Sequence, residues 1–284
     1  MPRIFHLFAM FLLLLSGCSS DEQTAPVGPD PELGIIDVPA EKPTIQAAID
    51  AAESGQIVRV AAGTYSGDGN RDLVVQDKSI TIKSVSGLEQ TIIDCDGDEQ
   101  DQHFGFEFAA GSTGSTLEGF TITEGYSVQG SAIRCVSSSP VIRECLFRDN
   151  FATISGGAIR CKSSSPVIEG CTFVGNASST GSVLFLIANS APVISNCIFA
   201  FNEGDITVSS SDVGSRPDIN CCDVYGNVQG NWVGVLEGLE DTNDNFSLDP
   251  DFRDAGVGDY GLNLNSPCLP GNSGCGQVGA LGAN

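Results

Sequence analysis

The sequence predicts an all-β fold, a single-stranded right-handed parallel β-helix (a solenoid) with an N-terminal capping helix. The first observation is a repeated phrase: SSSPVIRECLFRDN at 137–150, SSSPVIEGCTFVGN at 163–176, NSAPVISNCIFAFN at 189–202, and a looser copy at 215–227. The second is the period-two alternation of Ile, Val, Phe and Cys inside each copy, which is typical of half-buried strands. A fixed period of this length indicates stacked repeat units.

Other repeat folds fit this period less well. Leucine-rich repeats need regularly spaced leucines, which are sparse here, and propeller blades need about 40 residues or more. In a parallel β-helix, equivalent residues of successive coils stack about 4.8 Å apart. We therefore expect three ladders: Cys145, Cys171, Cys197 and Cys222; Phe147, Phe173, Phe199 and Val224; and, at a turn, Asn150, Asn176, Asn202 and Asn227.

The N-terminal residues have the pattern of an export signal. One Arg precedes an apolar run at 4–15, which is too short for a membrane span. The sequence Leu-Ser-Gly-Cys at 15–18 resembles the bacterial lipobox. The resemblance implies a lipoprotein signal peptide at 1–17 and lipidation of Cys18, and Ser19 implies sorting to the outer membrane. An ordinary signal peptide with a chance cysteine is the alternative.

A polar stretch at 18–38 is expected to be a flexible tether. After it, Ile45, Ala48, Ile49 and Ala52 follow helical spacing, with Thr44 placed to cap the start and Gly55 to end it. We expect this helix, at 44–54, to cover the open apolar end of the stack. The β-helix would then occupy 39–250, with a C-terminal cap at 251–284.

Two segments outside the repeats resemble known β-helix proteins. PTIQAAIDAAESGQIVRVAAGTY at 43–65 is similar to the N-terminal segment of pectin-lyase-like proteins, which include pectin methylesterases. DPDFRDAGVGDYGLNLNSPCLPGNSGCGQVGA at 249–280 resembles the tail of secreted right-handed β-helix proteins. With the repeats, the resemblance covers about 41–280. It is specific for the fold and carries little information on activity.

The catalytic motifs of that superfamily are mostly absent. The chain lacks the methylesterase aspartate motifs, the paired aspartates and Gly-His-Gly of polygalacturonase-type hydrolases, and the pectate-lyase pattern. We therefore predict no catalytic residue. His103, the one histidine after the signal, is expected on a solvent-facing loop, although carboxylates near it leave a general base open.

Two acidic loops are candidates for Ca²⁺, because hard cations prefer clustered carboxylate oxygens. Neither matches an EF-hand, and a solvated turn is the alternative for each. The expectation for cofactors is therefore none, or Ca²⁺. The candidate ligands are Asp94, Asp96 and Asp98 in the first loop, and Asp241, Asn243 and Asn245 in the second.

The 11 cysteines favour an exported protein, and those in the repeats are expected to act as stacked small hydrophobic residues. Pairing between stacked cysteines stays open. Cys268 and Cys275 flank a turn outside the repeats, so a disulfide between them is expected to lock the C-terminal cap.

The chain is strongly acidic, with a net charge of −23, which argues against nucleic acid as a partner. Five cations nevertheless fall within 29 residues: Arg134, Arg143, Arg148, Arg160 and Lys162. The alternation and the repeat place Arg134 and Arg160 outward on adjacent coils, where like charges should repel. Duplication of one coil is one explanation, and a small binding site for anionic sugars is the other.

From these features we expect a lipid-anchored protein of the cell envelope, at the outer membrane, with a binding or structural role. Its expected partners are a polysaccharide or a cell-surface component, and the membrane through the lipid anchor. A polysaccharide lyase or another carbohydrate-active enzyme of the pectin-lyase-like superfamily is the alternative, because lyases can use one Arg or Lys as base with Ca²⁺ as electrophile.

Overall fold

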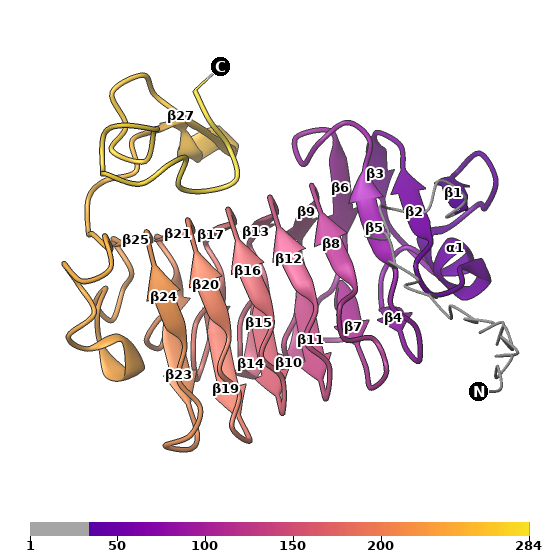
Figure 1. Cartoon of the computed structure of the whole chain (residues 1–284), viewed down its shortest axis with the longest axis horizontal. Helices are drawn as coiled ribbons and strands as arrows, with labels where there is room; N and C mark the ends of the chain where they lie inside the picture. The colour runs from indigo at the N-terminus through magenta and orange to yellow at the C-terminus, as the bar shows by residue number, and fades with distance from the viewer. Residues whose placement is uncertain (1–33, 284) are drawn as a thin grey trace, which may run out of the picture. The chain divides into compact units, whose positions relative to one another are not determined.

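Residues 34–283 are described by the structure, a computed structural model, and they form a parallel β-helix (Figure 1). Each complete coil runs through four parallel sheets, named here sheets 1 to 4. Sheet 1 has eight strands, in the order β1 (Ile35–Val38), β2 (Ile57–Val60), β5 (Thr81–Ser84), β8 (Thr116–Glu118), β12 (Val141–Arg143), β16 (Val167–Glu169), β20 (Val193–Ser195) and β24 (Asp218–Asn220). Sheet 2 has seven, in the order β3 (Gly63–Tyr65), β6 (Thr91–Asp94), β9 (Thr121–Thr123), β13 (Leu146–Arg148), β17 (Thr172–Val174), β21 (Ile198–Ala200) and β25 (Asp223–Tyr225).

The other two sheets complete the coil. Sheet 3 has four strands, β10 (Tyr126–Gln129), β14 (Phe151–Ser155), β18 (Ala177–Ser178) and β22 (Glu203–Gly204). Sheet 4 has six, in the order β4 (Leu73–Val75), β7 (Phe106–Phe108), β11 (Ile133–Val136), β15 (Ile159–Lys162), β19 (Leu184–Ile187) and β23 (Val208–Ser210). The predicted all-β solenoid is therefore confirmed.

The predicted ladders form the core of the coils. The Phe173 ring lies between those of Phe147 and Phe199, with ring centroids 4.8 and 4.9 Å apart, and all three side chains are fully buried. The four cysteines of the cysteine ladder are also fully buried. The stacking follows from the strand register, which pairs Phe147 with Phe173 and Phe173 with Phe199.

The asparagine ladder is confirmed as well. The Nδ2 atom of Asn150 donates to Oδ1 of Asn176, at 3.0 Å, and that of Asn176 to Oδ1 of Asn202, at 3.1 Å. Asn202 donates in the same way to Asn227, at 2.9 Å. Each of these Nδ2 atoms also donates to a backbone carbonyl of an adjacent coil, as from Asn176 to Phe147 O, 2.9 Å. Because these amides are buried, this network removes the cost of unpaired polar groups.

A helix covers the N-terminal end of the core, as expected. Helix α1 spans Ile45–Ala51, and Thr44 Oγ1 accepts from the backbone N–H of Ala47 at 3.3 Å. Its buried residues Ile45, Ala48 and Ile49 join the main apolar cluster. The helix is shorter than the predicted 44–54, because the backbone is already extended at Ala52.

The predicted tether at 18–38 extends too far. Strand β1 pairs in register with β2, Ile35 opposite Ile57, so the β-helix begins at Ile35. Strand β1 lies at the edge of sheet 1 and its sequence is not a copy of the repeat, so the repeat pattern could not identify it as a strand. The signal peptide at 1–17, Cys18 and the rest of the tether up to residue 33 lie outside the described residues. Among the described helices, none has the length and apolar character to cross a membrane.

The C-terminal cap predicted at 251–284 is not at the end of the stack. Trp232 and Leu236, the latter in the 3-10 helix η1 (Gly234–Leu236), pack against the core after the last coil. The later residues form an antiparallel hairpin of β26 (Phe252–Asp254) and β27 (Asp259–Leu262), joined by the 3-10 helix η2 (Ala255–Val257).

The segment that contains this hairpin lies along the outer face of sheet 2. The backbone N–H of Gly279 donates to Asn196 O at 2.7 Å, and that of Ala280 donates to Thr172 Oγ1 at 2.9 Å. Leu146 and Ile198 point outward from sheet 2 and are buried beneath it. An apolar outer face needs such a cover, which explains why the segment folds back.

The predicted Cys268–Cys275 disulfide is wrong. Cys275 is bonded to Cys221, with Cα atoms 5.7 Å apart, whereas Cys268 is a buried free thiol. The fold-back brings Cys275 beside the turn after β24, while the Cys268 thiol donates to Asp223 Oδ2 at 3.4 Å. The other described cysteines, including those of the ladder, are also free thiols.

Candidate functional site

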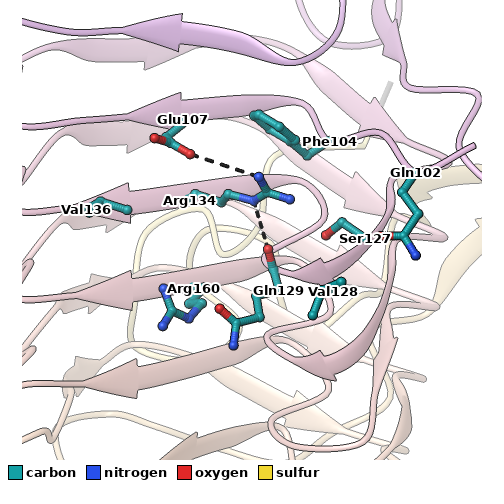
Figure 2. Close-up of a pocket in the computed structure, with 9 residues that line it drawn as sticks. All are labelled: Gln102, Phe104, Glu107, Ser127, Val128, Gln129, Arg134, Val136 and Arg160. Atoms are coloured by element: carbon teal, nitrogen blue, oxygen red, sulfur yellow. Dashed lines mark hydrogen bonds and ion pairs between the residues drawn. The ribbon is translucent and has the colours of Figure 1, made fainter.

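A pocket of about 450 Å³ lies on the outer face of sheet 4, beside the edge of sheet 3 (Figure 2). We call it the arginine pocket. Sheet 4 contributes Glu107, Arg134, Val136 and Arg160, strand β10 contributes Ser127, Val128 and Gln129, and the loop before β7 contributes Gln102 and Phe104.

The strand register produces the floor of this pocket. Glu107, Arg134 and Arg160 are register partners on β7, β11 and β15. Ile133 and Cys135, which flank Arg134, are fully buried, so the alternation turns the arginine outward. The prediction that Arg134 and Arg160 stack outward on adjacent coils is confirmed.

Arg134 is held in place from three sides. Its guanidinium carbon lies 3.7 Å from the centroid of the Phe104 ring, and its Nε donates to Gln129 O at 2.8 Å. Nη1 lies 4.0 Å from Glu107 Oε2, which is a weak ion pair. Burial lowers the pKa of Arg134, and the Glu107 charge only partly opposes this. These contacts offset the repulsion that the sequence predicted between the two arginines.

Arg160 has fewer partners. Among the described residues, neither its buried Nε nor the buried Oγ of Ser127 has a hydrogen-bond partner. Burial lowers the pKa of Arg160, and within residues 34–283 no carboxylate charge reverses the effect. A pocket lined by a partly desolvated cation and by an unpaired hydroxyl is a favourable place for an anion with several acceptor oxygens.

The other three predicted cations do not join this pocket, so the five do not form one cluster. Arg143, on sheet 1, pairs with Glu118 at 2.6 Å, and Arg148, on sheet 2, pairs with Asp149 at 2.7 Å. Lys162 is exposed on β15, outside the lining of the pocket. For Arg143 and Arg148 the reason is geometric, because neighbours in sequence within one coil are carried to different sheets; Lys162 stays on sheet 4 but lies two residues beyond Arg160 along β15.

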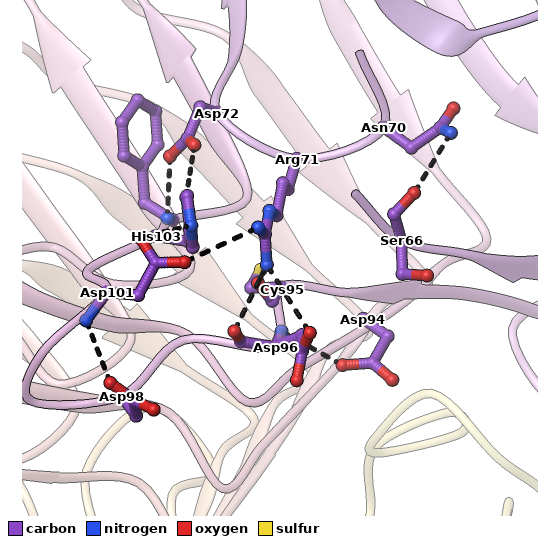
Figure 3. Close-up of polar contacts among 11 residues, drawn as sticks. Ser66, Asn70, Arg71, Asp72, Asp94, Cys95, Asp96, Asp98, Asp101 and His103 are labelled. Carbon is purple, nitrogen blue, oxygen red and sulfur yellow. Dashed lines mark hydrogen bonds and ion pairs between the residues drawn. The ribbon is translucent and has the colours of Figure 1, made fainter. Parts of the chain in front are cut away.

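His103 is not the solvent-facing loop residue that the sequence suggested (Figure 3). Its side chain is 15% exposed, and Nδ1 lies 2.6 Å from Asp72 Oδ2. Nε2 is buried and lies 3.1 Å from Asp101 Oδ1, a contact without good hydrogen-bond alignment. Burial lowers the pKa of His103, but the hydrogen bond to Asp72 and the close Asp101 carboxylate outweigh it, so the pKa is raised overall.

The first candidate Ca²⁺ loop uses its carboxylates to build turns. Asp94 Oδ1 accepts from the N–H of Asp96 at 3.0 Å, and Asp98 Oδ1 accepts from the N–H groups of Gln100 and Asp101. The bonds from Asp101 and Gln100 lower the pKa of Asp98. Within residues 34–283, no three acidic, histidine or cysteine side chains are grouped to hold a metal ion.

The second candidate loop also has a structural role. Asn245 is buried, with Oδ1 accepting from Cys222 N at 3.1 Å and Nδ2 donating to Ile219 O at 3.1 Å. Asp241 and Asn243 are exposed in left-handed backbone conformations, 58° and 51° in φ. The loop therefore places its three predicted ligands in different environments.

Sequence reasoning missed several residues of the arginine pocket. Glu107 carried a usable signal, because Phe106 and Phe108 on either side of it alternate with it and are fully buried. Phe104 and Ser127 had no such signal in the sequence, because they reach the pocket from a loop and from sheet 3.

Comparison with known proteins supports the architecture. A sequence model described as "Right handed beta helix region" matches residues 78–241, more than half of the chain. A search of curated proteins found no significant match. The fold is consistent with the pectin-lyase-like superfamily, which the N-terminal segment at 43–65 resembles. Because the family match covers most of the stacked coils, the chain belongs to the right-handed β-helix family.

Proposed function

We propose that this protein is a lipid-anchored protein of the cell envelope that binds an acidic polysaccharide, or a cell-surface component with similar chemistry, at the arginine pocket. The observation that carries the proposal is Arg160, whose buried Nε has no partner among the described residues, stacked beside Arg134. Guanidinium groups bind carboxylates through two parallel hydrogen bonds. A uronic-acid unit would supply that carboxylate and also hydroxyls for Ser127.

The surface beside the pocket favours a polymer over a single small anion. Phe185 follows Arg160 in the same register column, and Ser209 follows Phe185. An aromatic ring and a hydroxyl are suited to contact the next sugar units. Coils repeat about every 4.8 Å, so a chain lying across the strands would meet a new side chain at each coil.

The net charge of −23 limits the affinity of one site, because long-range fields repel a polyanion. We expect millimolar binding by a single molecule, with strong salt dependence, since screening acts over about 8–10 Å. Many anchored copies on one membrane would raise the effective affinity for one polymer. A lipid anchor at Cys18, at the outer membrane, would provide that arrangement.

Replacing Arg160 by glutamine should weaken binding of an oligouronate by about tenfold or more, because a charge-assisted hydrogen bond is lost. Arg143→Gln is the matched control: it removes the same charge from sheet 1, where Arg143 pairs with Glu118. NMR titration or affinity electrophoresis at low salt would measure both. Equal losses in the two variants would show that only net charge matters and would contradict the proposed site.

A polysaccharide lyase remains the second candidate, supported by Arg134 beside Glu107 and by Arg160 on the next coil of sheet 4. The pocket holds one carboxylate and no histidine, which favours binding over catalysis. The same incubations, with and without Ca²⁺, should be followed for unsaturated uronate ends. Their appearance with wild-type protein and not with Arg134→Gln would favour the lyase.

Replacing Cys18 by alanine should release the protein from membranes or block its maturation, because the acylated sulfur would be lost. Fractionation of cells and the apparent mass of the product would measure this. A variant that stays in the membrane fraction at wild-type level and size would contradict the lipid anchor.

A further inference from the structure

We propose that His103 is a proton-dependent positioning residue of the arginine pocket, and that anion binding there weakens when His103 loses its proton. The inference rests on the proposed function. His103 does not line the pocket, but its neighbours Gln102 and Phe104 do. Its Nε2 is buried, so it acts through these neighbours and not by touching a ligand.

The Asp72 carboxylate connects His103 to one wall of the pocket. Its Oδ2 lies 2.6 Å from His103 Nδ1, and its Oδ1 accepts from the backbone N–H of Phe104 at 2.9 Å (Figure 3). The Phe104 ring in turn lies 3.7 Å from the Arg134 guanidinium carbon. A continuous set of contacts therefore runs from the imidazole to an arginine of the pocket.

The backbone of His103 connects to the opposite wall. Its carbonyl accepts from the N–H of Tyr126 at 2.9 Å. The residues that follow Tyr126 in β10 line the pocket, and Gln129 O accepts from Arg134 Nε. Movement of the His103 loop would thus disturb two of the three contacts of Arg134, those with Phe104 and Gln129.

The charged groups around His103 favour its protonated form. Asp72, from the segment before β4, and Asp101, from its own loop, face the two ring nitrogens. Arg71 opposes them, with Nη2 at 3.9 Å from Asp101 Oδ2. Asp98 lies earlier in the same loop, and its pKa is lowered mainly by the backbone N–H groups of Asp101 and Gln100.

A further titratable group near Asp72 is the thiol of Cys95, after β6. Burial raises its pKa strongly, with Asp72 adding to the effect, so it stays neutral. His103 is consequently the group at this contact that changes charge near neutral pH. When protonated, its ring carries a positive charge between the two carboxylates, with Nδ1 bonded to Asp72 and Nε2 facing Asp101. When neutral, it no longer balances these carboxylates, and the net charge beside the pocket becomes more negative by one unit.

The sign of the pH dependence follows from the raised pKa. Because the pKa of His103 lies above 6.5 in the folded protein, its positioning effect is present below that pKa and is lost as pH rises through it. Uronate carboxylates stay ionised throughout this range, so the ligand does not change. Affinity should therefore fall toward alkaline pH, although Arg134 and Arg160 remain charged.

The test measures the dissociation constant of a defined oligouronate from about pH 5.5 to about pH 8.5 at constant ionic strength. We expect wild type to bind about tenfold more weakly at the upper end. His103→Gln should bind with no such dependence. Asp72→Asn suits the left-handed backbone at position 72 (φ 54°) and should move the midpoint to lower pH, because it removes a bond that raises the pKa of His103.

Asp223→Asn is the control for the titration of a group that lies outside the arginine pocket. Asp223 titrates at about pH 7 but lies on sheet 2, away from the pocket, so the variant should keep the wild-type pH dependence of binding. The inference would be overturned if binding by His103→Gln kept the wild-type dependence on pH. It would also be overturned if the midpoint of that pH dependence were unchanged in Asp72→Asn.

A second measurement needs no ligand and separates this inference from the proposed function. Hydrogen exchange of the Phe104 amide, corrected for intrinsic rates, should become faster in wild type above the pKa of His103 and should not depend on pH in His103→Gln. Absence of binding at every pH would reject the proposed function. Phe104 protection that is constant with pH in wild type would reject the role of His103, whatever the binding result.

Discussion

Replacing Phe173 by alanine should lower the free energy of unfolding by about 3–5 kcal/mol, the range for large truncations in a packed core. The ring is fully buried and stacks on both sides, at 10° to Phe147 and 6° to Phe199. Neither neighbour can fill the space without breaking its own register. Chemical denaturation would measure the loss.

The damage should be local, because each coil of a solenoid is supported mainly by its neighbours. Hydrogen exchange should show reduced protection around residues 147–199. Phe151→Ala is a matched control from a neighbouring position: Phe151 is 38% exposed on sheet 3, and its ring lies at 31° to that of Tyr126. We expect that control to cost about 1 kcal/mol. An equal loss in the free energy of unfolding for the two variants would show that stacking in the phenylalanine ladder does not stabilise the protein more than an exposed ring does.

Asp223 should make the protein less stable as the pH rises from about 4 to about 8. Its side chain is fully buried, and burial raises the pKa to about 7 from the model-peptide value of 3.8. The N–H of Leu248 donates to Oδ1 at 3.1 Å and the Cys268 thiol to Oδ2, which oppose the shift, whereas the nearby charge of Asp249 adds to it.

The direction follows from proton linkage. A raised pKa means that the folded state holds the proton more tightly than the unfolded chain. The contribution of Asp223 to the free energy of unfolding is therefore fully present below pH 3.8 and is lost as pH rises through about 7. The two pKa values differ by an amount equivalent to about 4 kcal/mol.

Asp223→Asn should leave stability unchanged near pH 4 and raise it by up to about 4 kcal/mol near pH 8. Asparagine has a similar shape and can still accept from Leu248. Denaturation midpoints of wild type and variant across this range would measure the difference. Asp218→Asn is the control, since Asp218 is exposed on β24 and should change little. A stability difference between wild type and Asp223→Asn that is the same at both pH values would contradict a buried, titrating Asp223.

The sequence by itself determined the repeating part of this protein. The 26-residue period and the alternation within each copy placed Phe173, Cys171 and Asn176 in their ladders. Helical spacing and Thr44 placed α1 at the N-terminal end of the core. These features are predictable because each coil repeats the same local backbone. A residue's inward or outward direction then follows from its position in the repeat.

Only the tertiary structure decided which residues meet outside the repeat. Cys275 pairs with Cys221 and not with its sequence neighbour Cys268, because the C-terminal segment folds back over sheet 2. Adjacent strands of one coil belong to different sheets, so cations close in sequence separate onto different faces. Conversely, the pocket joins a loop, sheet 3 and sheet 4, and His103 meets Asp72 across 31 residues. Such contacts depend on how non-repeating segments pack against the stack, and no local periodicity encodes that packing.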